Sequence, residues 1–354
     1  MKPIALVALA SAALLLAACS TAEFYLQGIS GEIDLLSRAR PISAVLESTR
    51  DPVLRAKLER VVEIRDYASR ELGLPDNLSY KRYSELERRF VTWNVFATPQ
   101  LSLGALQWCF PIAGCVNYRG YFNEADARAE AAKLSAKGDD VYIGGVPAFS
   151  TLGYFADPML STFIRYPDVE IARLIFHELA HQVVYAKDDT VFNESYAVTV
   201  EEEGLRRWLA AEHDPELDRQ YALSERYRVT FRRLVDGTRS RLEKLYASAA
   251  SDQAKRAAKA EAFAAMREEY DAAKRAWGGF SAYDYWFQHP NNASLAAVGL
   301  YTDKVPEFRA LLAAEGGDLP RFYAKVKELA ALPKAQRETA LAQAAGTRSS
   351  RAAE

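Results

Sequence analysis

The sequence is poor in several residue types that define whole classes of protein. Its 354 residues include only three cysteines, too few for a framework of disulfides or a set of iron–sulfur clusters. Basic residues show no excess, because 45 Lys and Arg stand against 47 Asp and Glu, so nucleic acid is not an expected partner. Beyond the first twenty residues, no segment is long and apolar enough to span a membrane. Histidine is scarce as well, with four in the chain, so the positions of the histidines are informative.

The N-terminus has the features of an export signal. Lys2 precedes an apolar run from Ile4 to Ala18, and Cys19 follows directly. This arrangement resembles the lipobox of bacterial lipoproteins, which implies that residues 1–18 are removed and that Cys19 is lipidated. Because no Asp follows Cys19, the resemblance implies the outer membrane, with the protein facing the periplasm and touching the membrane only through its lipid. A plain secretory signal or an uncleaved anchor is the alternative.

The expected periplasmic location bears on the chemistry of the other two cysteines. Cys109 and Cys115 are separated by a short segment in which Pro111 and Gly114 allow the chain to turn. In an oxidising periplasm, a disulfide between them is the default expectation. A thiolate metal site is the alternative, but it needs further ligands, and the sequence nearby offers none.

Hydrophobic periodicity predicts an α+β protein that is mostly helical, with one domain at residues 19–335. A small sheet is expected within about residues 76–150, ahead of a central helix, and the C-terminal half is expected to be helical. A tail at residues 336–354 has no periodic apolar face and is predicted to be flexible. Helices are predicted within 29–74 and at 123–136, 168–186, 193–212, 215–248, 252–275, 291–302, 304–316 and 318–331; strands are predicted at 89–97, 116–122 and 140–143.

The residues that carry chemistry are concentrated in the sequence His-Glu-Leu-Ala-His at positions 177–181. On a helix, His177 and His181 lie one turn apart on the same face, so both imidazoles can bind one metal ion. Glu178 points about 100° away around the helix axis. It can therefore act as a general base on water that zinc has acidified, without binding the metal itself. Two ordinary histidines at helical spacing are the alternative explanation of the same pattern.

A catalytic zinc site needs a third protein ligand, and the next predicted helix offers two. Glu194 and Glu201 lie on one face of that helix, about 10 Å apart, so one ion cannot bind both. The short connection at residues 186–192 is long enough to bring either carboxylate back to the histidines. For Glu201, which is followed by two more glutamates, a solvated helix face is the other possibility.

Several motifs resemble those of a known family. His-Glu-Leu-Ala-His followed by Asn193-Glu194 resembles the gluzincin metallopeptidases, whose aminopeptidase branch binds zinc through the glutamate after the asparagine. Residues 89–210 more closely resemble a bacterial family of zinc aminopeptidase-like lipoproteins. The resemblance implies Zn²⁺ as the cofactor, a peptide as the substrate, Glu194 as the third ligand and Glu201 as the second choice. The matching segments are VTWNVFATP, CFPIAGCVNYRGYF, GGVPAFSTLGYF, HELAHQ and FNESYA, with weaker likeness at NNASLA and EGGDLPRFY.

Contacts with the substrate are harder to predict. Gluzincin aminopeptidases hold a substrate on a strand that precedes the zinc helix and carries a glutamate. Gly144 and Gly145 stand at that place without a carboxylate, so their backbone is expected either to pair with an extended peptide or simply to form a turn. The donor that stabilises the carbonyl oxygen during hydrolysis is sought among Arg119 and several tyrosines. The tyrosine candidates are Tyr121, Tyr154, Tyr283 and Tyr285.

The remaining polar residues near the C-terminal half are expected to be structural. His213 and His289 are excluded as ligands, because they precede Asp-Pro and Pro and are typical of a helix end and a turn. Asn291 is expected to cap the following helix. The sequence therefore predicts a zinc-dependent peptide hydrolase, with aminopeptidase activity as the finer expectation. A non-catalytic binding or assembly lipoprotein with a structural metal site is the alternative.

Overall fold

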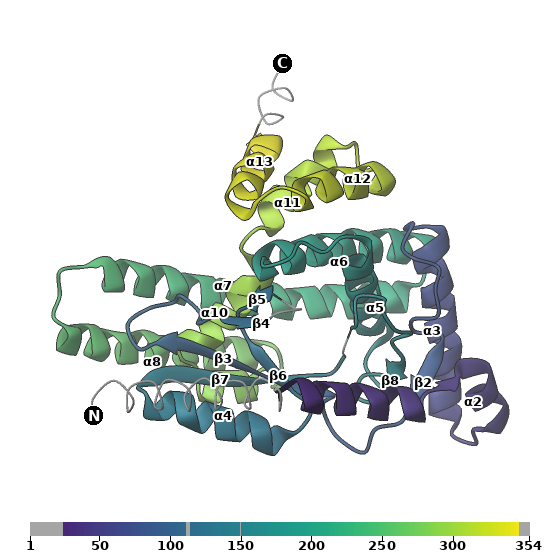
Figure 1. Ribbon diagram of the computed structural model, residues 1–354, viewed down its shortest axis with the longest axis horizontal. Coiled ribbons are helices and arrows are strands. Elements are labelled where there is room, and N and C mark those ends of the chain that lie inside the picture. The colour runs from purple at the N-terminus through teal and green to yellow at the C-terminus, as the bar shows by residue number, and fades with distance from the viewer. Residues whose placement is uncertain (1–23, 111–113, 149, 347–354) are drawn as a thin grey trace, which may run out of the picture.

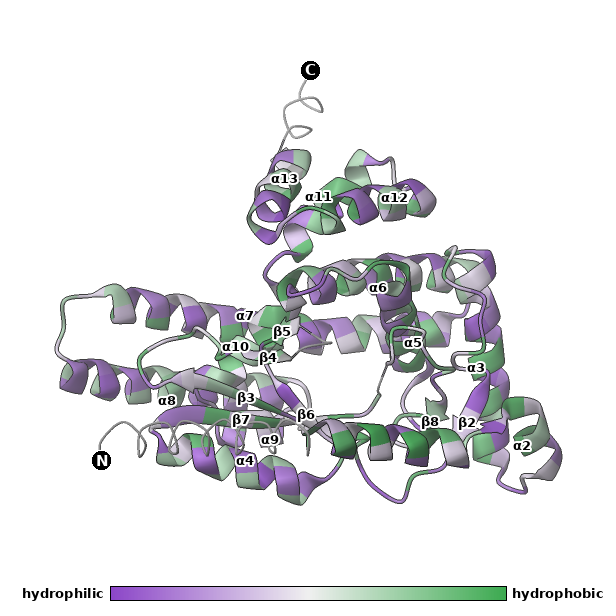
Figure 2. Cartoon of the chain, in the orientation of Figure 1, coloured by the Kyte–Doolittle hydropathy of each residue, from purple (hydrophilic) through white to green (hydrophobic). Residues whose placement is uncertain are grey.

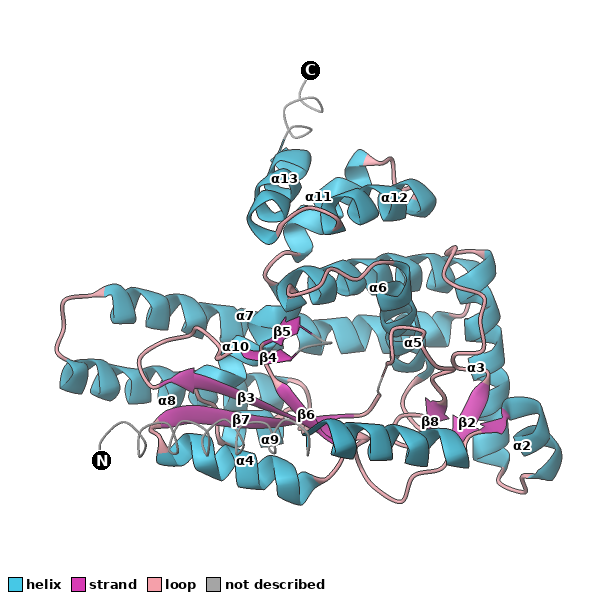
Figure 3. Cartoon of the chain, viewed as in Figure 1, coloured by secondary structure: helices cyan, strands magenta, loops and turns pink. Residues whose placement is uncertain are grey.

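The structure is a computed structural model that describes residues 24–110, 114–148 and 150–346. The predicted signal segment 1–18 and Cys19 lie outside the described residues. Helices make up most of the chain and the strands are small (Figures 1 and 3), which confirms the prediction of a mostly helical α+β fold. None of the helices within the described ranges is long and apolar enough to cross a membrane.

A three-stranded antiparallel sheet with the order β6–β3–β7 lies between two helices. Along β3, Val95 and Ala97 pack in one cluster with residues of α4, whereas Phe96 packs on the opposite face against α10. This alternation is the period of two that a strand requires when both of its faces are covered. The elements are β3 (Thr92–Pro99), β6 (Arg119–Tyr121), β7 (Asp139–Val146), α4 (Glu124–Ala136) and α10 (Asn292–Thr302).

Smaller strand pairs complete the β structure. Cys109 and Cys115 face each other across a hairpin and form a disulfide, which confirms that prediction. A second three-stranded arrangement, in the order β1–β2–β8, was not predicted because its strands are only two or three residues long. The hairpin consists of β4 (Trp108–Phe110) and β5 (Gly114–Val116), and the other arrangement of β1 (Arg40–Pro41), β2 (Arg82–Ser84) and β8 (Met159–Leu160).

The largest hydrophobic core surrounds helix α5. Ile175, Phe176 and Leu179 are completely buried among side chains of α3 and α6. Two carboxylates start the neighbouring helices, because Asp51 caps α3 and Asp189 caps α6 through bonds to backbone N–H groups. The predicted helices here end within a few residues of the observed ones, which are α2 (Ile42–Ser48), α3 (Pro52–Arg70), α5 (Asp168–Val183) and α6 (Thr190–Glu212), preceded by a helix at residues 24–38.

Two long helices, α7 (Pro215–Ala247) and α8 (Asp252–Ala276), pack side by side as an antiparallel pair (Figure 1). Hydrophilic residues predominate along both helices (Figure 2), as expected for a helix pair with a solvated outer face. Their inner faces share a second core with α9 (Asp284–Gln288), in which Tyr270 stacks on Phe287 with ring centroids 4.0 Å apart.

The C-terminal helices are α11 (Val305–Ala314), α12 (Leu319–Ala330) and α13 (Lys334–Gly346). The cap of α10 follows the prediction, since Asn291 and Ser294 form a capping box. The flexible tail predicted from residue 336 is wrong as far as Gly346, because α13 packs on α11 and α12. Leu341 is 2% exposed, and Arg337 donates to the buried carboxylate of Asp189 at 2.6 Å. These tertiary contacts stabilise a helix whose own sequence has little amphipathic pattern.

Candidate metal centre

The two histidines of the motif lie on the buried face of α5 and point toward each other. The Nε2 atoms of His177 and His181 are 3.2 Å apart, and each side chain is almost completely buried. The helix places them there because a spacing of four residues is close to one turn. The sequence prediction that both rings share one side of the helix is therefore matched by the geometry.

Glu194 completes this group from the second turn of α6. Its Oε2 atom lies 3.2 Å from Nε2 of His177 and 3.7 Å from Nε2 of His181. The side chain of the preceding residue, Asn193, fixes the return loop by bonding both the N–H and the C=O of Ala186, at 2.7 and 2.8 Å. The two adjacent residues thus have complementary roles: Asn193 holds the return loop, and Glu194 contacts the histidines.

These three residues form a group that can hold a metal ion. Four donors around a zinc ion, each at about 2.0–2.1 Å, stand about 3.3 Å apart, close to the separations seen between the three atoms here. The hydrogen bonding of His177 is also compatible with a bound metal ion. Nδ1 of His177 lies 2.8 Å from a carboxylate oxygen of Glu201 and must donate to it, because an ionised carboxylate only accepts. Because Nδ1 donates to Glu201, Nε2 is the atom of His177 that would bind a metal ion once the ring is neutral.

The electrostatics favour positive charge at the same point. Burial lowers the pKa of His177, but hydrogen bonds to Glu194 and Glu201 outweigh burial and raise this pKa well above its ordinary value. Burial alone would raise the pKa of Glu194, but His181 and His177 lower it to about 2. His177, His181 and Glu194 therefore form a set of possible metal ligands in which Glu194 is anionic. The surrounding charges favour a cation at this point.

Glu201, the second choice for the third ligand, lies behind His177 rather than beside the ligand atoms. One of its oxygens accepts from His177, and the other accepts from Arg173 at 3.2 Å. Arg173 in turn donates to Glu225 of α7 at 3.1 Å. This chain of buried charges orients the His177 ring, as carboxylates commonly do for metal-binding histidines.

Glu178 faces a pocket of about 630 Å³ that also exposes His177, His181 and Glu194. Burial raises the pKa of Glu178, against the opposing influence of the two histidines. It forms no hydrogen bond with any described residue, so its carboxylate is not committed to a structural role. A base next to the ligand group, inside a partly desolvated pocket, is the arrangement that general-base chemistry requires.

Four tyrosines that the sequence analysis did not select also line this pocket: Tyr25, Tyr118, Tyr185 and Tyr301. The ring of Tyr301, at the end of α10, lies 6.3 Å from the ring of His177, and Tyr118 precedes β6. The negative charge of Glu194 contributes most to raising the pKa of Tyr301, and burial raises the pKa of Tyr118. Both phenols therefore stay protonated and can donate hydrogen bonds. No local signal distinguished them from the nineteen tyrosines of the chain, because each depends on where its element packs.

The residues predicted to contact substrate lie mostly outside the pocket. Arg119 pairs with Glu130 at 3.1 Å and stacks over Phe24, while Tyr121 is buried in the core beneath the sheet. The structure therefore does not bring them to the ligand group, since strand alternation turns their side chains toward α4. Tyr118, which directly precedes Arg119, lines the pocket instead.

Other candidates also do not line the pocket. Tyr154 is 85% exposed and Tyr285 is 63% exposed, and Tyr283 stacks on Phe231 in the core of α7 and α8. Gly144 and Gly145 lie in β7, an edge strand of the sheet order, and do not line the pocket, although the following Val146 does. His213 ends α6 in a left-handed conformation and His289 ends α9, and neither joins the ligand group.

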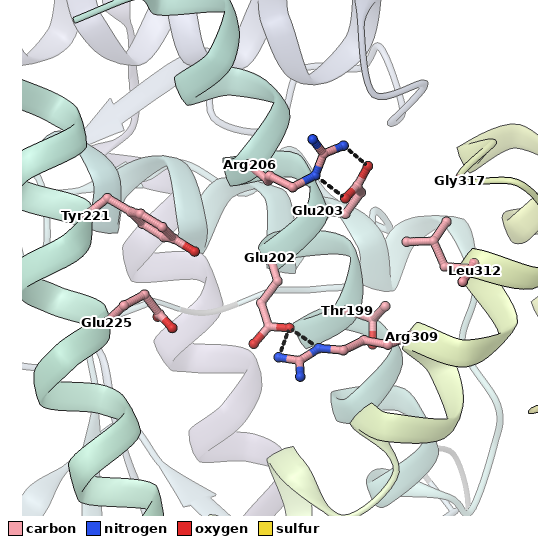
Figure 4. A pocket seen from close by; sticks show the side chains of 10 residues that line it. Thr199, Glu202, Glu203, Arg206, Tyr221, Glu225, Arg309, Leu312 and Gly317 are labelled. Atoms are coloured by element: carbon pink, nitrogen blue, oxygen red, sulfur yellow. Dashed lines mark hydrogen bonds and ion pairs between the residues drawn. The ribbon is translucent and has the colours of Figure 1, made fainter. Parts of the chain in front are cut away.

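A second cavity of about 450 Å³ lies on the other side of α6, between α7 and α11. Its charged side chains pair with one another, as Figure 4 shows for Arg309 with Glu202 and for Arg206 with Glu203. Because its charges are already neutralised within the wall, this cavity has the character of a solvated seam between helices. The pocket at α5, by contrast, is lined by the His-His-Glu group and by Glu178, whose carboxylate forms no hydrogen bond with the described residues.

The fold and the site define a helical protein with a small sheet and a His-His-Glu group at the wall of a deep pocket. The chain belongs to the family described as "Putative aminopeptidase", whose model matches residues 23–341. This match supports a peptidase function in coarse terms. No curated protein and no solved structure shows detectable similarity to the chain.

Proposed function

We propose that this protein is a zinc-dependent peptidase of the gluzincin type, and specifically an aminopeptidase. The observation that carries the proposal is the convergence of His177, His181 and Glu194 beside Glu178 in one pocket. When bound to these ligands, zinc supplies a Lewis acid that acidifies water and polarises a carbonyl group. The family membership supports the same reaction class.

The residues of the chain then have distinct roles. Glu178 takes a proton from the attacking water and delivers it to the nitrogen of the leaving amine. Among the tyrosines that line the pocket, we assign Tyr118 and Tyr301 as donors to the carbonyl oxygen as it gains negative charge. Glu201 holds the orientation of His177. His177 and His181 are almost completely buried, and the lower local dielectric constant strengthens each of these interactions.

A structural metal site in a binding lipoprotein is the competing proposal. Structural zinc sites are closed by four protein ligands, whereas catalytic sites use three and keep one position open. Within the described residues, the ligand group has three members. This count favours the catalytic proposal, and the free carboxylate of Glu178 supports it.

We further propose that the protein is lipid-anchored through Cys19 at the outer membrane and faces the periplasm. The lipobox-like sequence supports this location. The Cys109–Cys115 disulfide is the kind of bond that persists in an oxidising compartment.

Removal of the metal tests the function. A soluble form that begins after Cys19 should hydrolyse short peptides, lose this activity on dialysis against a chelator, and regain it with one equivalent of Zn²⁺. The expected stoichiometry follows from the single ligand group within the described residues. Dialysis against buffer without chelator is the control. Full hydrolysis by a protein shown to be free of metal would refute the proposal.

Glu201→Gln tests the orienting role of Glu201. Partners that orient a metal-binding histidine typically contribute a factor of about 10–100 in metal affinity, so Zn²⁺ should bind that much more weakly. Saturating Zn²⁺ should still give one ion per chain, because the three ligands remain. Competition with a zinc-chelating dye measures the affinity, and Glu203→Gln on the same helix is the control. Failure to bind Zn²⁺ even at saturation would instead make Glu201 a ligand.

A further inference from the structure

The helix at residues 24–38 forms one wall of the pocket that contains the ligand group. Gln27 fixes this helix to β6 by donating to the carbonyl of Gly120 at 3.2 Å and accepting from the N–H of Phe122 at 3.0 Å. The contact is close, because a Cβ added to Gly31 would lie 2.1 Å from the Phe122 ring. The position of the next residue, Glu32, is therefore set by packing and not by chance.

Glu32 is a buried carboxylate for which the fold supplies no partner. Its side chain lines the pocket, the residue is 9% exposed, and its Oε2 atom has no hydrogen-bond partner. It forms no ion pair with any described residue. Burial, with a contribution from Asp157, raises its pKa to about 7. An unpaired buried carboxylate is costly, and such groups call for a specific explanation, of which a bound cation is one.

The surroundings of Glu32 indicate what kind of cation fits. Ile29, Ile33 and Leu36 of the same helix line the pocket beside it, together with Phe122. A metal ion would need several polar donors, and this apolar wall does not offer them. A primary ammonium group attached to an apolar residue can satisfy both the carboxylate and the wall.

Glu32 shares its pocket with the ligand group. His177, His181 and Glu194 line this same pocket, and so does Glu178. An extended peptide advances about 3.3–3.6 Å per residue. A short peptide held at Glu32 can therefore extend within the same pocket toward His177 and His181.

We propose that Glu32 is a specificity-determining residue that binds a primary ammonium group of the substrate. This inference rests on the proposed peptidase function and assigns the part of the pocket that selects the substrate. In a peptide, the ammonium is either the N-terminal amine or a lysine side chain. The N-terminal amine makes the enzyme an exopeptidase, and a lysine side chain makes it selective for basic residues.

Binding measured without turnover tests the assignment. In a Glu178→Gln background, calorimetry compares three peptides: a free tetrapeptide of leucine and alanine, its N-acetylated form, and an N-acetylated form with one lysine. At least one ammonium-bearing peptide should bind about 10–100-fold more tightly than the N-acetylated peptide without lysine. Adding Glu32→Gln should abolish that preference and leave the affinity for the N-acetylated peptide unchanged. The peptide that loses affinity identifies the source of the ammonium.

Asp34→Asn is the matched control, because Asp34 lies on the same helix but pairs with Arg38 at the surface. It should leave the preference intact. Thermal unfolding checks the fold, and Glu32→Gln should not lower the Tm, since it removes a buried charge that has no partner. A preference that survives Glu32→Gln, or the lack of any preference in the parent protein, overturns the inference. If the preference depends on Glu32 but the zinc-loaded wild type cleaves no peptide, the ammonium site stands and the peptidase proposal fails.

Discussion

Glu178→Gln should reduce peptide hydrolysis by about 10²–10⁴-fold while the protein keeps its zinc. The amide has nearly the same shape as the carboxylate, so it preserves the pocket but cannot accept a proton from water. The carboxylate is available for this role because it faces the pocket and forms no hydrogen bond with the described residues. Steady-state kinetics with a short peptide, beside a measurement of bound zinc, checks both parts of the prediction.

The informative result is that Glu178→Gln loses activity but retains bound zinc. If Glu178→Gln lost zinc, Glu178 would belong to the ligand set and the geometry of the three-residue group would be misread. If it kept both zinc and the wild-type rate, the general-base role would be wrong. Glu59→Gln, at an exposed position of α3, is a control that removes one carboxylate far from the pocket wall.

Glu194→Ala should produce a protein that purifies without zinc and has no hydrolytic activity above background. The substitution removes the one anionic donor of the group and leaves two histidines, which hold a divalent ion poorly. The loss should far exceed the change of about 10–100-fold expected for Glu201→Gln, because a ligand is removed rather than a partner of a ligand. Elemental analysis after gel filtration measures the bound metal.

The comparison with Glu203→Ala on the same helix separates metal loss from damage to α6, since Glu203 pairs with Arg206 and Arg207 away from the histidines. Circular dichroism of both variants reports on the helix content. A Glu194→Ala protein that binds one zinc ion with wild-type affinity would exclude Glu194 as a ligand. Glu201 would then have to be reconsidered.

The sequence predicted the parts of the site that lie close together along the chain. His177, Glu178 and His181 share one helix, and helical periodicity by itself places both imidazoles on one side. The bond between Cys109 and Cys115 was predictable for the same reason, because a short turn connects them. The choice between Glu194 and Glu201 depended on a resemblance. Both carboxylates contact His177, but the return loop held by Asn193 places Glu194 beside the Nε2 atoms of both histidines, whereas Glu201 meets Nδ1 of His177.

The other residues of the pocket could not be predicted from local sequence patterns. Tyr301 and Glu32 are remote from the motif in the chain, and neither belongs to a pattern that local sequence can reveal. Arg119 and Tyr121 were candidate donors to the carbonyl oxygen, but the register of β6 turns them toward α4. A slip of one residue in a strand reverses the face on which a side chain lies, so Tyr118 lines the pocket and Tyr121 does not.

The sequence by itself determined the helical class, the disulfide and the helix that carries both motif histidines, because each follows from contacts within a few residues or one turn. Tertiary structure decided which carboxylate lies beside the Nε2 atoms of the histidines, which one pairs with Nδ1 of His177, the order in α13 and the residues that line the pocket. The physical reason is that these depend on how helices and strands distant in the chain pack together. Packing energies are shared among many side chains and leave no mark at a single position in the sequence.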